Sequence, residues 1–552
     1  MNKYNNKRSL FLAVGLMTGL YVSAQDTYLN ASAVTGGLNG TARYVGMGGA
    51  MEALGADLST IGSNPAGVGL FRSSRANVSF GFVSQEKGKS FGGAQKTTMS
   101  FDQAGFVYSM RTDKRSFVNF AFNYNKSANF DFILSAASAL DGASQNKSIT
   151  QKAQKGYYEL AKNTEGRVIG YDGSSTNVSN RYNAVDFLYY NALTTEDKPD
   201  GNFSYFYNNA SGYTFDRAHT GYIGEYDFNV SGNYNDRFYW GLTVGVYDVH
   251  YNAYSQYTEE LLNAAKSSVG SVRMTDDRKI TGTGFDIKAG VIFRPIEESP
   301  FRIGLSVATP TWYDLTSSYY TRLDNNTVGL GRYDYVDTRA SYDFKLFTPW
   351  KFGVSAGTTF ANMLAVGASF EYADYKSMDT RIKDGGYYYD DGTIYSNSHG
   401  DKLMNSATKR ILKGVSTLKV GAEFRPDPSI AVRLGYNYIS PMYNKNAERP
   451  IDVNSLSNAF TSTTDYTNWD ATNRITAGIG YTVDNFTIDV AYQYSAQNGK
   501  FHPFVNSDYT RTGTSTENGQ TVLTKQTETN YANAVKVKNN RHQLLLTLGY
   551  KF

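Results

Sequence analysis

The sequence predicts an all-β fold: a transmembrane antiparallel β-barrel of about 14 strands, with a small N-terminal hatch in the lumen and helical extracellular loops. Three observations predict it. The 552 residues include 45 Tyr, 32 Phe and 52 Gly, and aromatic side chains favour strands over helix interiors. Apolar and polar side chains alternate with period 2 along many segments. Short connections between these segments alternate with long ones.

The composition excludes several classes of protein. Only 41% of the residues are hydrophobic and the mean hydropathy is −0.45, which excludes a helical membrane bundle. The aromatic content of 15% is the opposite of a disordered composition. Because the chain contains no Cys, it has no disulfide, thiolate metal site, lipoprotein anchor or thiol nucleophile.

Residues 1–24 are predicted to be a signal peptide. Three basic residues precede an apolar stretch at 10–22, which ends in the small-residue cleavage site Val22-Ser23-Ala24. The alternative is a single anchoring helix, for which the apolar stretch is too short. Removing this segment, which carries three positive and no negative charges, lowers the formal net charge from +4 to +1. A near-neutral chain gives no electrostatic reason to expect nucleic acid or anionic lipid as a partner.

The alternation predicts an even number of strands, as a closed barrel requires. We expect them near 75–86, 98–111, 116–128, 214–233, 236–256, 278–294, 300–318, 339–357, 362–379, 409–425, 428–441, 472–483, 485–499 and 541–552. Tight turns join alternate pairs, and the long connections between them include 87–97, 129–213, 257–277, 319–338, 380–408, 442–471 and 500–540. Short turns on one side and long loops on the other are typical of outer-membrane barrels.

Two parts of the chain are expected to lie outside the barrel wall. Residues 25–74 are rich in small residues and contain Asn64-Pro65-Ala66, and such a compact segment fits a lumen too wide for wall side chains to fill. The barrel itself is expected to span 75–552, with its largest loop at 129–213.

Helices are expected in the long loops. Apolar residues follow helical spacing between Phe132 and Leu140 and again at Val185, Leu188 and Leu193, and a third helix is predicted over 259–268 with Thr258 as its N-cap. Their apolar faces would capture a hydrophobic ligand, or would instead pack on each other and on the barrel rim. The candidate capture residues are Phe132, Ile133, Leu140 and Leu188.

Five features resemble the FadL/OmpP1/TodX family of outer-membrane transporters for hydrophobic compounds. They are Asn64-Pro65-Ala66, the strand pair GFDIKAGVIFRPIEESPFRIGLSVATP at 284–310, Thr348-Pro349-Trp350-Lys351-Phe352, the strand pair LKVGAEFRPDPSIAVRLGYNYISP at 418–441, and the terminal GYKF. The resemblance covers most of the mature chain by architecture and these segments by motif.

The resemblance implies a 14-stranded barrel closed by an N-terminal hatch that includes Asn64, Pro65 and Ala66. Family members capture fatty acids or aromatic hydrocarbons among the outer loops and release them through a gap in the barrel wall. That gap lies at a kink of the third strand, here 116–128, which contains no Pro to force one. A monomer in the bacterial outer membrane is expected, with membrane lipid, lipopolysaccharide and the barrel-assembly machinery as partners.

The sequence gives little support for catalysis or metal binding. Gly353-Val354-Ser355-Ala356-Gly357 matches the G-x-S-x-G pattern, but it lies within an alternating strand and not on a strand-to-helix elbow. The histidines are scattered, which disfavours a metal site but leaves a single axial haem ligand open. They are His219, His250, His399, His502 and His542.

The remaining lumen charges and three alternative functions stay open. Inward charges are expected to pair across the lumen or to hold a ligand carboxylate: Lys288, Lys351, Glu371, Lys419, Glu423 and Arg433. Passive transport of a hydrophobic molecule, without enzymatic activity or cofactor, is the main prediction. The alternatives are a protein-interaction component of a secretion or lipid-export system, a haemin receptor and a lipolytic enzyme.

Overall fold

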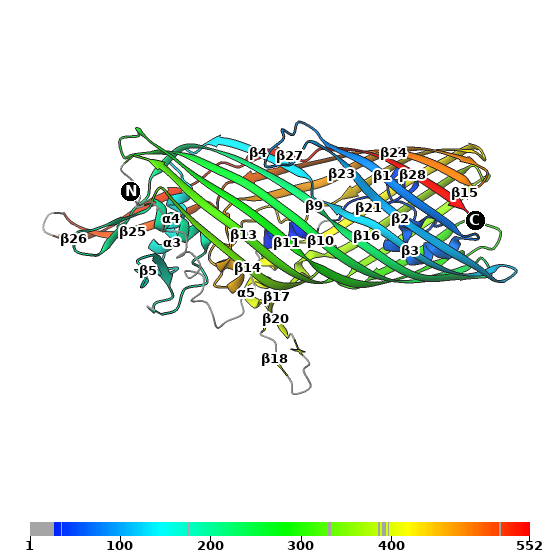
Figure 1. Ribbon diagram of the computed structural model, residues 1–552, viewed down its shortest axis with the longest axis horizontal. Coiled ribbons are helices and arrows are strands. Elements are labelled where there is room, and N and C mark those ends of the chain that lie inside the picture. The colour runs from blue at the N-terminus through cyan, green and yellow to red at the C-terminus, as the bar shows by residue number, and fades with distance from the viewer. Residues whose placement is uncertain are drawn as a thin grey trace, which may run out of the picture.

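The computed structural model describes residues 27–34, 36–174, 176–328, 333–384, 387–388, 394–395, 397–517 and 520–552. The predicted signal peptide, 1–24, lies outside the described residues. The chain forms a long barrel of tilted antiparallel strands (Figure 1). At its left-hand end in Figure 1 lie the long loops, and at the other end lie the short turns and the C-terminus. We call these the loop end and the turn end.

The barrel is closed because β1 (Arg75–Gln85) pairs with both β2 (Thr97–Asp113) and β28 (Arg541–Lys551). The wall has 14 strand positions, which confirms the predicted number. The positions that follow β2 are β3 (Ser116–Asn129) with β4 (Phe132–Ala139), β9 (Asn209–Tyr234), β10 (Phe238–Leu262), β11 (Ser268–Phe293), β12 (Arg302–Ala308) with β13 (Trp312–Thr327), β15 (Lys351–Phe360) with β14 (Tyr335–Phe347), β16 (Leu364–Asp374) with β17 (Asp379–Lys383), β21 (Gly414–Asp427) with β20 (Ser398–Gly400), β22 (Ile430–Ile439), β23 (Tyr466–Val483), β24 (Phe486–His502), and β28 with β27 (Val535–Lys538).

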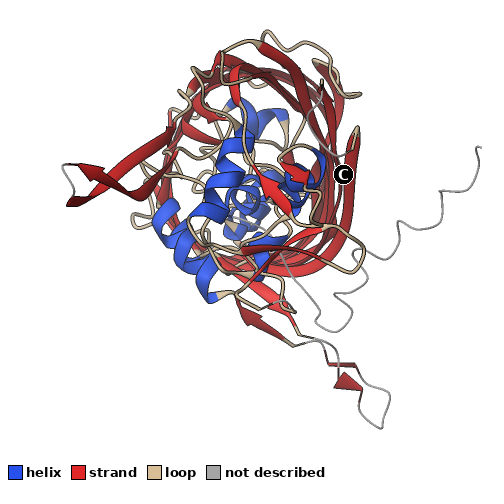
Figure 2. Cartoon of the chain, turned by 90° about the vertical axis from the view of Figure 1, so that its left-hand side faces the viewer, coloured by secondary structure: helices blue, strands red, loops and turns tan. Residues whose placement is uncertain are grey.

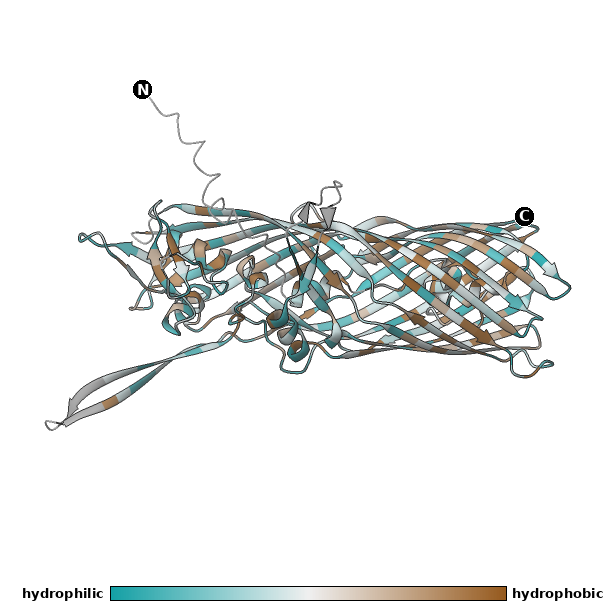
Figure 3. Cartoon of the chain, turned by 90° about the horizontal axis from the view of Figure 1, so that it is seen from below, coloured by the Kyte–Doolittle hydropathy of each residue, from teal (hydrophilic) through white to brown (hydrophobic). Residues whose placement is uncertain are grey.

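An apolar band faces outward near the turn end. Along β10 the outward residues from Phe238 to Val246 are 38–49% exposed, and they alternate with inward side chains. Figure 3 shows apolar residues alternating along the strands at this end. The free energy of such a surface is lowest in hydrocarbon, so residues 238–246 of β10 form a membrane-spanning segment. Beyond this level β9, β10 and β11 continue, since they have 26, 25 and 26 residues.

The turns follow the local sequence. Asn235 and Asp236, which join β9 to β10, have φ values of 51° and 54°, and Asn and Asp are among the residues that tolerate this left-handed conformation. None of the helices among the described residues is long and apolar enough to cross a membrane.

The N-terminal segment, residues 27–74, lies inside the barrel. It contains α1 (Thr27–Ala33), α2 (Ala42–Gly46), η2 (Leu58–Gly62) and η3 (Pro65–Leu70). Helices fill the centre of the ring of strands in Figure 2. α2 packs against β22, β23, β24 and β28, whereas η3 packs against β9, β10 and β11. The segment therefore contacts opposite parts of the wall.

Wall glycines allow the N-terminal segment to approach the strands closely. A Cβ on Gly435 of β22 would lie 2.2 Å from the backbone nitrogen of Gly48, and one on Gly241 of β10 would lie 2.3 Å from the carbonyl carbon of Pro65. Either distance is far below van der Waals contact. Wall and segment are consequently complementary in shape at these two places.

Charges on the wall pair with the N-terminal segment, as predicted for Lys419 and Glu423. Arg43 Nε donates to Glu423 Oε2 at 2.9 Å, and Lys419 Nζ donates to Glu52 Oε1 at 2.7 Å. Arg433 also donates to Glu423, at 2.6 Å. Lys288 pairs with Glu225 and Asp227 within the wall.

Two of the three predicted loop helices are wrong. Residues 132–139 form β4, which pairs with 212–219 of β9. Glu259 lies within β10, which ends at Leu262, and Ser268 begins β11, so the third predicted helix is the end of a hairpin. In both cases the long neighbouring strand offers a backbone ladder, and this tertiary pairing overrides a short helical spacing of apolar residues.

The remaining loop elements lie at the loop end or along the side of the barrel toward its middle (Figure 1). The predicted helix at Val185 and Leu188 is confirmed as α4 (Ala184–Ala192), which begins with a capping box between Asn183 and Asp186. The others are α3 (Gln145–Gln154), β5 (Glu159–Lys162), β6 (Val168–Tyr171), β7 (Thr195–Asp197), β8 (Phe203–Tyr205), η4 (Tyr375–Ser377), β18 (Tyr387–Tyr388), β19 (Ile394–Tyr395), α5 (Lys402–Ile411), α6 (Leu456–Ala459), β25 (Ser507–Glu517) and β26 (Gln520–Asn530). We call residues 140–208, which include α3 and α4, the cap.

Candidate ligand cavity and wall opening

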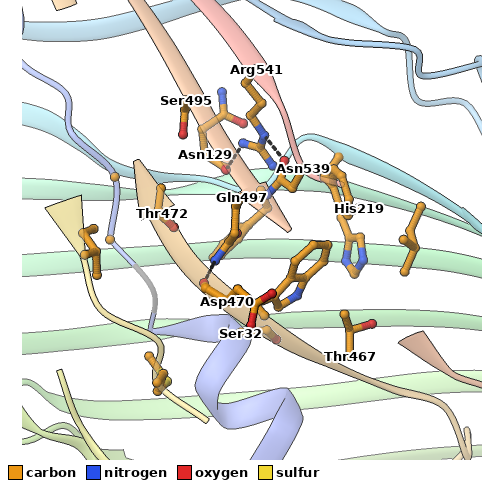
Figure 4. A pocket seen from close by; sticks show the side chains of 18 of the residues that line it. Ser32, Asn129, His219, Thr467, Asp470, Thr472, Ser495, Gln497, Asn539 and Arg541 are labelled. Atoms are coloured by element: carbon orange, nitrogen blue, oxygen red, sulfur yellow. Dashed lines mark hydrogen bonds between the residues drawn. The ribbon is translucent and has the colours of Figure 1, made fainter. Parts of the chain in front are cut away.

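A cavity of about 320 Å³ lies in the lumen between the N-terminal segment and the wall. Its lining comes from α1, from residues 36–39, from the β3–β4 junction, from residues 440–465 and from strands β1, β2, β9, β10, β21, β22, β23, β24 and β28. Figure 4 shows side chains from several of these strands converging on it. Its volume falls at the small end of the range of about 300–1,000 Å³ typical of ligand pockets.

Aromatic side chains form much of the cavity lining. Phe132 and Trp469 meet edge to face with centroids 5.7 Å apart, and Phe130 meets Tyr251 in the same way at 5.2 Å. Tyr28 of α1 stacks on Tyr443, with centroids 5.1 Å apart. These rings offer an apolar, π-rich surface to a ligand.

Polar groups border the same cavity and most are engaged with each other. Arg217 makes a bidentate ion pair with Asp465, with Nη–Oδ distances of 2.7 and 2.8 Å. His219 Nδ1 lies 2.9 Å from the Tyr251 hydroxyl. Arg541 donates to the carbonyl of Asn129 at 3.1 Å (Figure 4).

The barrel wall is interrupted beside this cavity. Pairing between β2 and β3 ends at Gln103 and Asn125. Beyond that point β2 continues to pair with β1, and β3 continues to pair with β9. Each strand also carries a bulge there, at Asp102 in β2 and at Ser127 in β3. No Pro is involved: the two bulges turn the strands apart.

Side chains and the N-terminal segment bridge the interrupted stretch. Lys126 Nζ donates to Ser100 Oγ at 2.7 Å across it, and Ser100 Oγ donates to Asp102 at 2.8 Å. Asn39 Nδ2 donates both to Asp102 and to the carbonyl of Lys126, each at 3.0 Å. We call Asn39, Ser100, Asp102 and Lys126 the polar bridge. Three of its members, Asn39, Asp102 and Lys126, line the cavity, so the cavity reaches the interruption.

The cap packs on the strands at the loop end. The Gln145 backbone N–H donates to Glu259 Oε1 at 2.6 Å, and the Tyr257 hydroxyl donates to the same oxygen at 2.5 Å. Burial raises the pKa of Glu259 from 4.5 to about 7. Burial also raises the pKa of Asp186 in α4, against the opposing effect of its ion pair with Lys152.

The structure places the four candidate capture residues in different surroundings. Phe132 lines the cavity. Ile133 packs with Ala94 and Ala218. Leu140 and Leu188 are buried in the apolar core shared by the cap and the wall, away from the cavity lining.

The Asn64-Pro65-Ala66 motif lies deep in the lumen, against β10, β11 and β12. Asn64 Oδ1 accepts a hydrogen bond from the Ala66 backbone at 3.1 Å, which caps η3. A Cβ on Gly290 would lie 2.0 Å from that oxygen, so the wall leaves room for it. Within the described residues, Asn64 Nδ2 is buried without a hydrogen-bond partner.

The other singled-out residues are dispersed. Ser355 lies in mid-strand, paired with Gly304 and Ser369 on its neighbours. Among the described residues no three His, Cys, Asp or Glu side chains are grouped to hold a metal ion. Of the five histidines His219 lines the cavity.

Sequence reasoning missed several cavity residues, among them Phe130, Trp469, Arg474, Ser495 and Arg541. Alternation does predict that Arg474 faces inward, because it lies on the face opposite to Ile475 and Ile479, and the structure exposes Ile475 on the outer surface. No sequence signal shows which inward residues of different strands lie side by side, because that depends on strand register.

Comparisons with known proteins give only distant similarities. No protein-family model and no curated protein matches the chain. The crystal structure of the toluene transporter TbuX of Ralstonia pickettii has 13% identity and a TM-score of 0.45, over 93% of this chain and 99% of that one. A Pseudomonas aeruginosa FadL homologue has 11% identity and a TM-score of 0.46, over 93% and 98%. The Pseudomonas putida toluene transporter TodX has 9% identity and a TM-score of 0.42, over 96% and 98%.

Proposed function

We propose that this chain is an outer-membrane channel of the FadL type, which carries hydrophobic molecules passively into the outer membrane. The observation that carries the proposal is the aromatic cavity of about 320 Å³ that reaches the unpaired stretch between β2 and β3. The loop end would then face the exterior and the turn end the periplasm. Phe132 contributes to ligand capture, whereas Ile133, Leu140 and Leu188 support the surrounding structure.

A sideways exit is the route that suits a hydrophobic ligand. Moving straight down the lumen would require displacing residues 42–70, which pack closely on wall glycines such as Gly435 and Gly241. An apolar ligand that entered a water-filled pore would also lose about 25 cal/mol for each Å² exposed. Passage between β2 and β3 leads from the cavity directly into lipid. The N-terminal segment, including Asn64, Pro65 and Ala66, acts as the hatch that keeps the lumen closed.

The proposed location defines the other partners. The outward apolar band would contact membrane lipid and lipopolysaccharide, and the barrel would act as a monomer. The terminal residue Phe552, which is 71% exposed, would be recognised by the barrel-assembly machinery.

A cross-link across the interruption tests the exit route. Ser100→Cys and Lys126→Cys place two thiols on the two sides of it, in a chain that has no other Cys. Joining them with a short bismaleimide should abolish uptake of a hydrophobic probe into intact cells, while the unlinked variant remains active. The matched control is Tyr108→Cys with Phe120→Cys, an outward pair on the same two strands where the ladder is intact.

Uptake that continued after complete cross-linking of the 100–126 pair would refute lateral release. If the wild-type protein takes up no hydrophobic probe at all, the channel proposal fails and an interaction component of a secretion or lipid-export system becomes the better explanation. Haem absorbance that is lost in His219→Ala would favour the haemin receptor.

A further inference from the structure

Two arginines of the cavity, on strands β23 and β28, lie on either side of one residue of β24 and face inward. Arg474 of β23 is in register with Ser495 of β24, and Ser495 is in register with Arg541 of β28. Cross-strand neighbours point to the same side of a sheet. All three residues line the cavity, and the two arginine Cα atoms are about 10 Å apart because neighbouring strands are 4.7–4.9 Å apart. Two long guanidinium side chains can therefore converge on a group placed above Ser495.

These arginines differ from the other inward cations in their partners. Within the described part of the chain neither Arg474 nor Arg541 forms an ion pair; Arg474 donates to the Asn437 amide oxygen, and Arg541 donates to Asn539 and to the Asn129 carbonyl. Other inward cations form ion pairs with carboxylates. Arg217 pairs with Asp465. Lys288 pairs with Glu225 and Asp227, and Arg433 pairs with Glu423 and Asp489.

The cavity as a whole is positively charged. Its lining contains five cationic side chains and three carboxylates, a formal charge of +2. The cations are Lys126, Arg217, Arg449, Arg474 and Arg541, and the carboxylates are Asp102, Asp465 and Asp470. Asp131 also acts electrostatically on Arg541, but within the described residues it forms no ion pair with it, so the positive surplus of the lining favours binding of an anion. Guanidinium groups bind carboxylate and sulfonate oxygens with charge-assisted hydrogen bonds.

Aromatic rings lie next to this cationic surface. The Arg541 guanidinium is 5.6 Å from the centroid of Phe132, which in turn contacts Trp469. Rings of this kind bind flat aromatic ligands by offset or edge-to-face stacking. The cavity is also compact, at about 320 Å³.

We infer that the cavity binds a compact aromatic acid, with its ring system beside Phe132 and Trp469 and its acid group between Arg474 and Arg541. This inference rests on the proposed function and specifies its substrate class. The two arginines determine specificity by discriminating an aromatic anion from a neutral hydrocarbon of the same shape.

Calorimetric titration of the full-length purified protein tests the inference with three probes: 2-naphthoate, its neutral methyl ester, and palmitate. Each titration is corrected with protein-free micelles. We expect 2-naphthoate to bind at least tenfold more tightly than either other probe. Arg474→Gln with Arg541→Gln should remove the preference for acid over ester, and the Lys double variant should keep part of it. Arg115→Gln, which removes an exposed charge outside the cavity, should leave the preference for acid over ester unchanged.

Equal binding of acid and ester by the wild-type protein would overturn the anion site, even if neither double variant folds. A preference for acid over ester that persists in the Gln double variant would also overturn the anion site. Tenfold tighter binding of palmitate would overturn the aromatic class. In each of these cases the channel proposal stands, whereas binding and cellular uptake of none of the three probes would refute the channel itself.

Discussion

Arg43 of the N-terminal segment and Glu423 of β21 form an ion pair across the lumen, with Nε and Oε2 2.9 Å apart. The same carboxylate accepts from Arg433 of the neighbouring strand. One buried carboxylate therefore joins the N-terminal segment and two strands of the wall.

Glu423→Gln should loosen the N-terminal segment. The substitution leaves Arg43 and Arg433 without this shared counter-charge, and breaking a buried ion pair costs about 3–5 kcal/mol. Hydrogen exchange of residues 42–62 should accelerate. The control is Glu297→Gln, which breaks an exposed pair with Arg115 and should change nothing. Unchanged exchange in the Glu423 variant would mean that packing alone holds the segment.

Gly435→Ala should displace the N-terminal segment from β22. The new Cβ would lie 2.2 Å from the Gly48 nitrogen, and backbone atoms cannot yield as a flexible side chain does. We expect a folded, heat-modifiable barrel whose residues 42–56 become accessible to protease. Gly513→Ala, whose Cβ would approach only a threonine hydroxyl at 3.2 Å, is the control. An equally protected segment in both variants would contradict the proposed close packing.

Phe132→Ala should lower ligand affinity about tenfold, because it removes a ring that lines the cavity; the ring also belongs to the core shared by the cap and the wall, so the change costs stability as well. Phe215→Ala removes a ring of the same size that is buried in the core shared by the cap and the wall. That control should cost stability, about 3–5 kcal/mol, and leave affinity unchanged. Calorimetric titration and thermal melting separate the two effects. Equal loss of affinity in both variants would remove Phe132 from the binding site.

The cap should be less stable at pH 8 than at pH 5. The pKa of Glu259 is raised from 4.5 to about 7 by burial, so the folded cap favours the protonated acid. Its contribution is complete below about pH 4.5 and is lost as the pH rises to about 7, a change of about 3 kcal/mol. Hydrogen exchange of residues 145–154, corrected for the intrinsic pH effect, measures it. Glu259→Gln should reduce the dependence to the part that the buried Asp186 contributes, and a variant that keeps the full dependence would point to another group.

Deleting Phe552 should impair assembly. Its backbone N–H donates to the carbonyl of Ser74 at 3.0 Å, and its ring contacts Tyr550 with centroids 5.0 Å apart at the closing strand. We expect a fall in heat-modifiable protein in the membrane fraction, and recovery in Phe552→Tyr. Normal insertion of the deletion variant would show that the terminal ring is dispensable.

Periodicity predicted the wall well because each strand faces two different environments. In β28 the outward residues Leu544, Leu546 and Leu548 are exposed, and the inward residues Gln543, Leu545 and Thr547 are buried. The sequence of the strand therefore alternates between apolar residues that face lipid and residues that face the lumen. The same reasoning failed for residues 132–139, where apolar residues at helical spacing form β4. There the long β9 offers hydrogen-bond partners, and local spacing could not reveal them.

The sequence by itself determined the barrel, its even strand count and the alternation of turns and loops, because these depend on side-chain period and turn chemistry along one stretch of chain. Only the tertiary structure decided that Arg474, Ser495 and Arg541 are neighbours and that the β2–β3 ladder stops at Gln103 and Asn125. Both depend on the register of each strand pair and on where its ladder stops. Alternation fixes which face a residue occupies, but a shift of two residues along a strand keeps that face, so the pattern along one strand does not identify the neighbours of a residue on other strands.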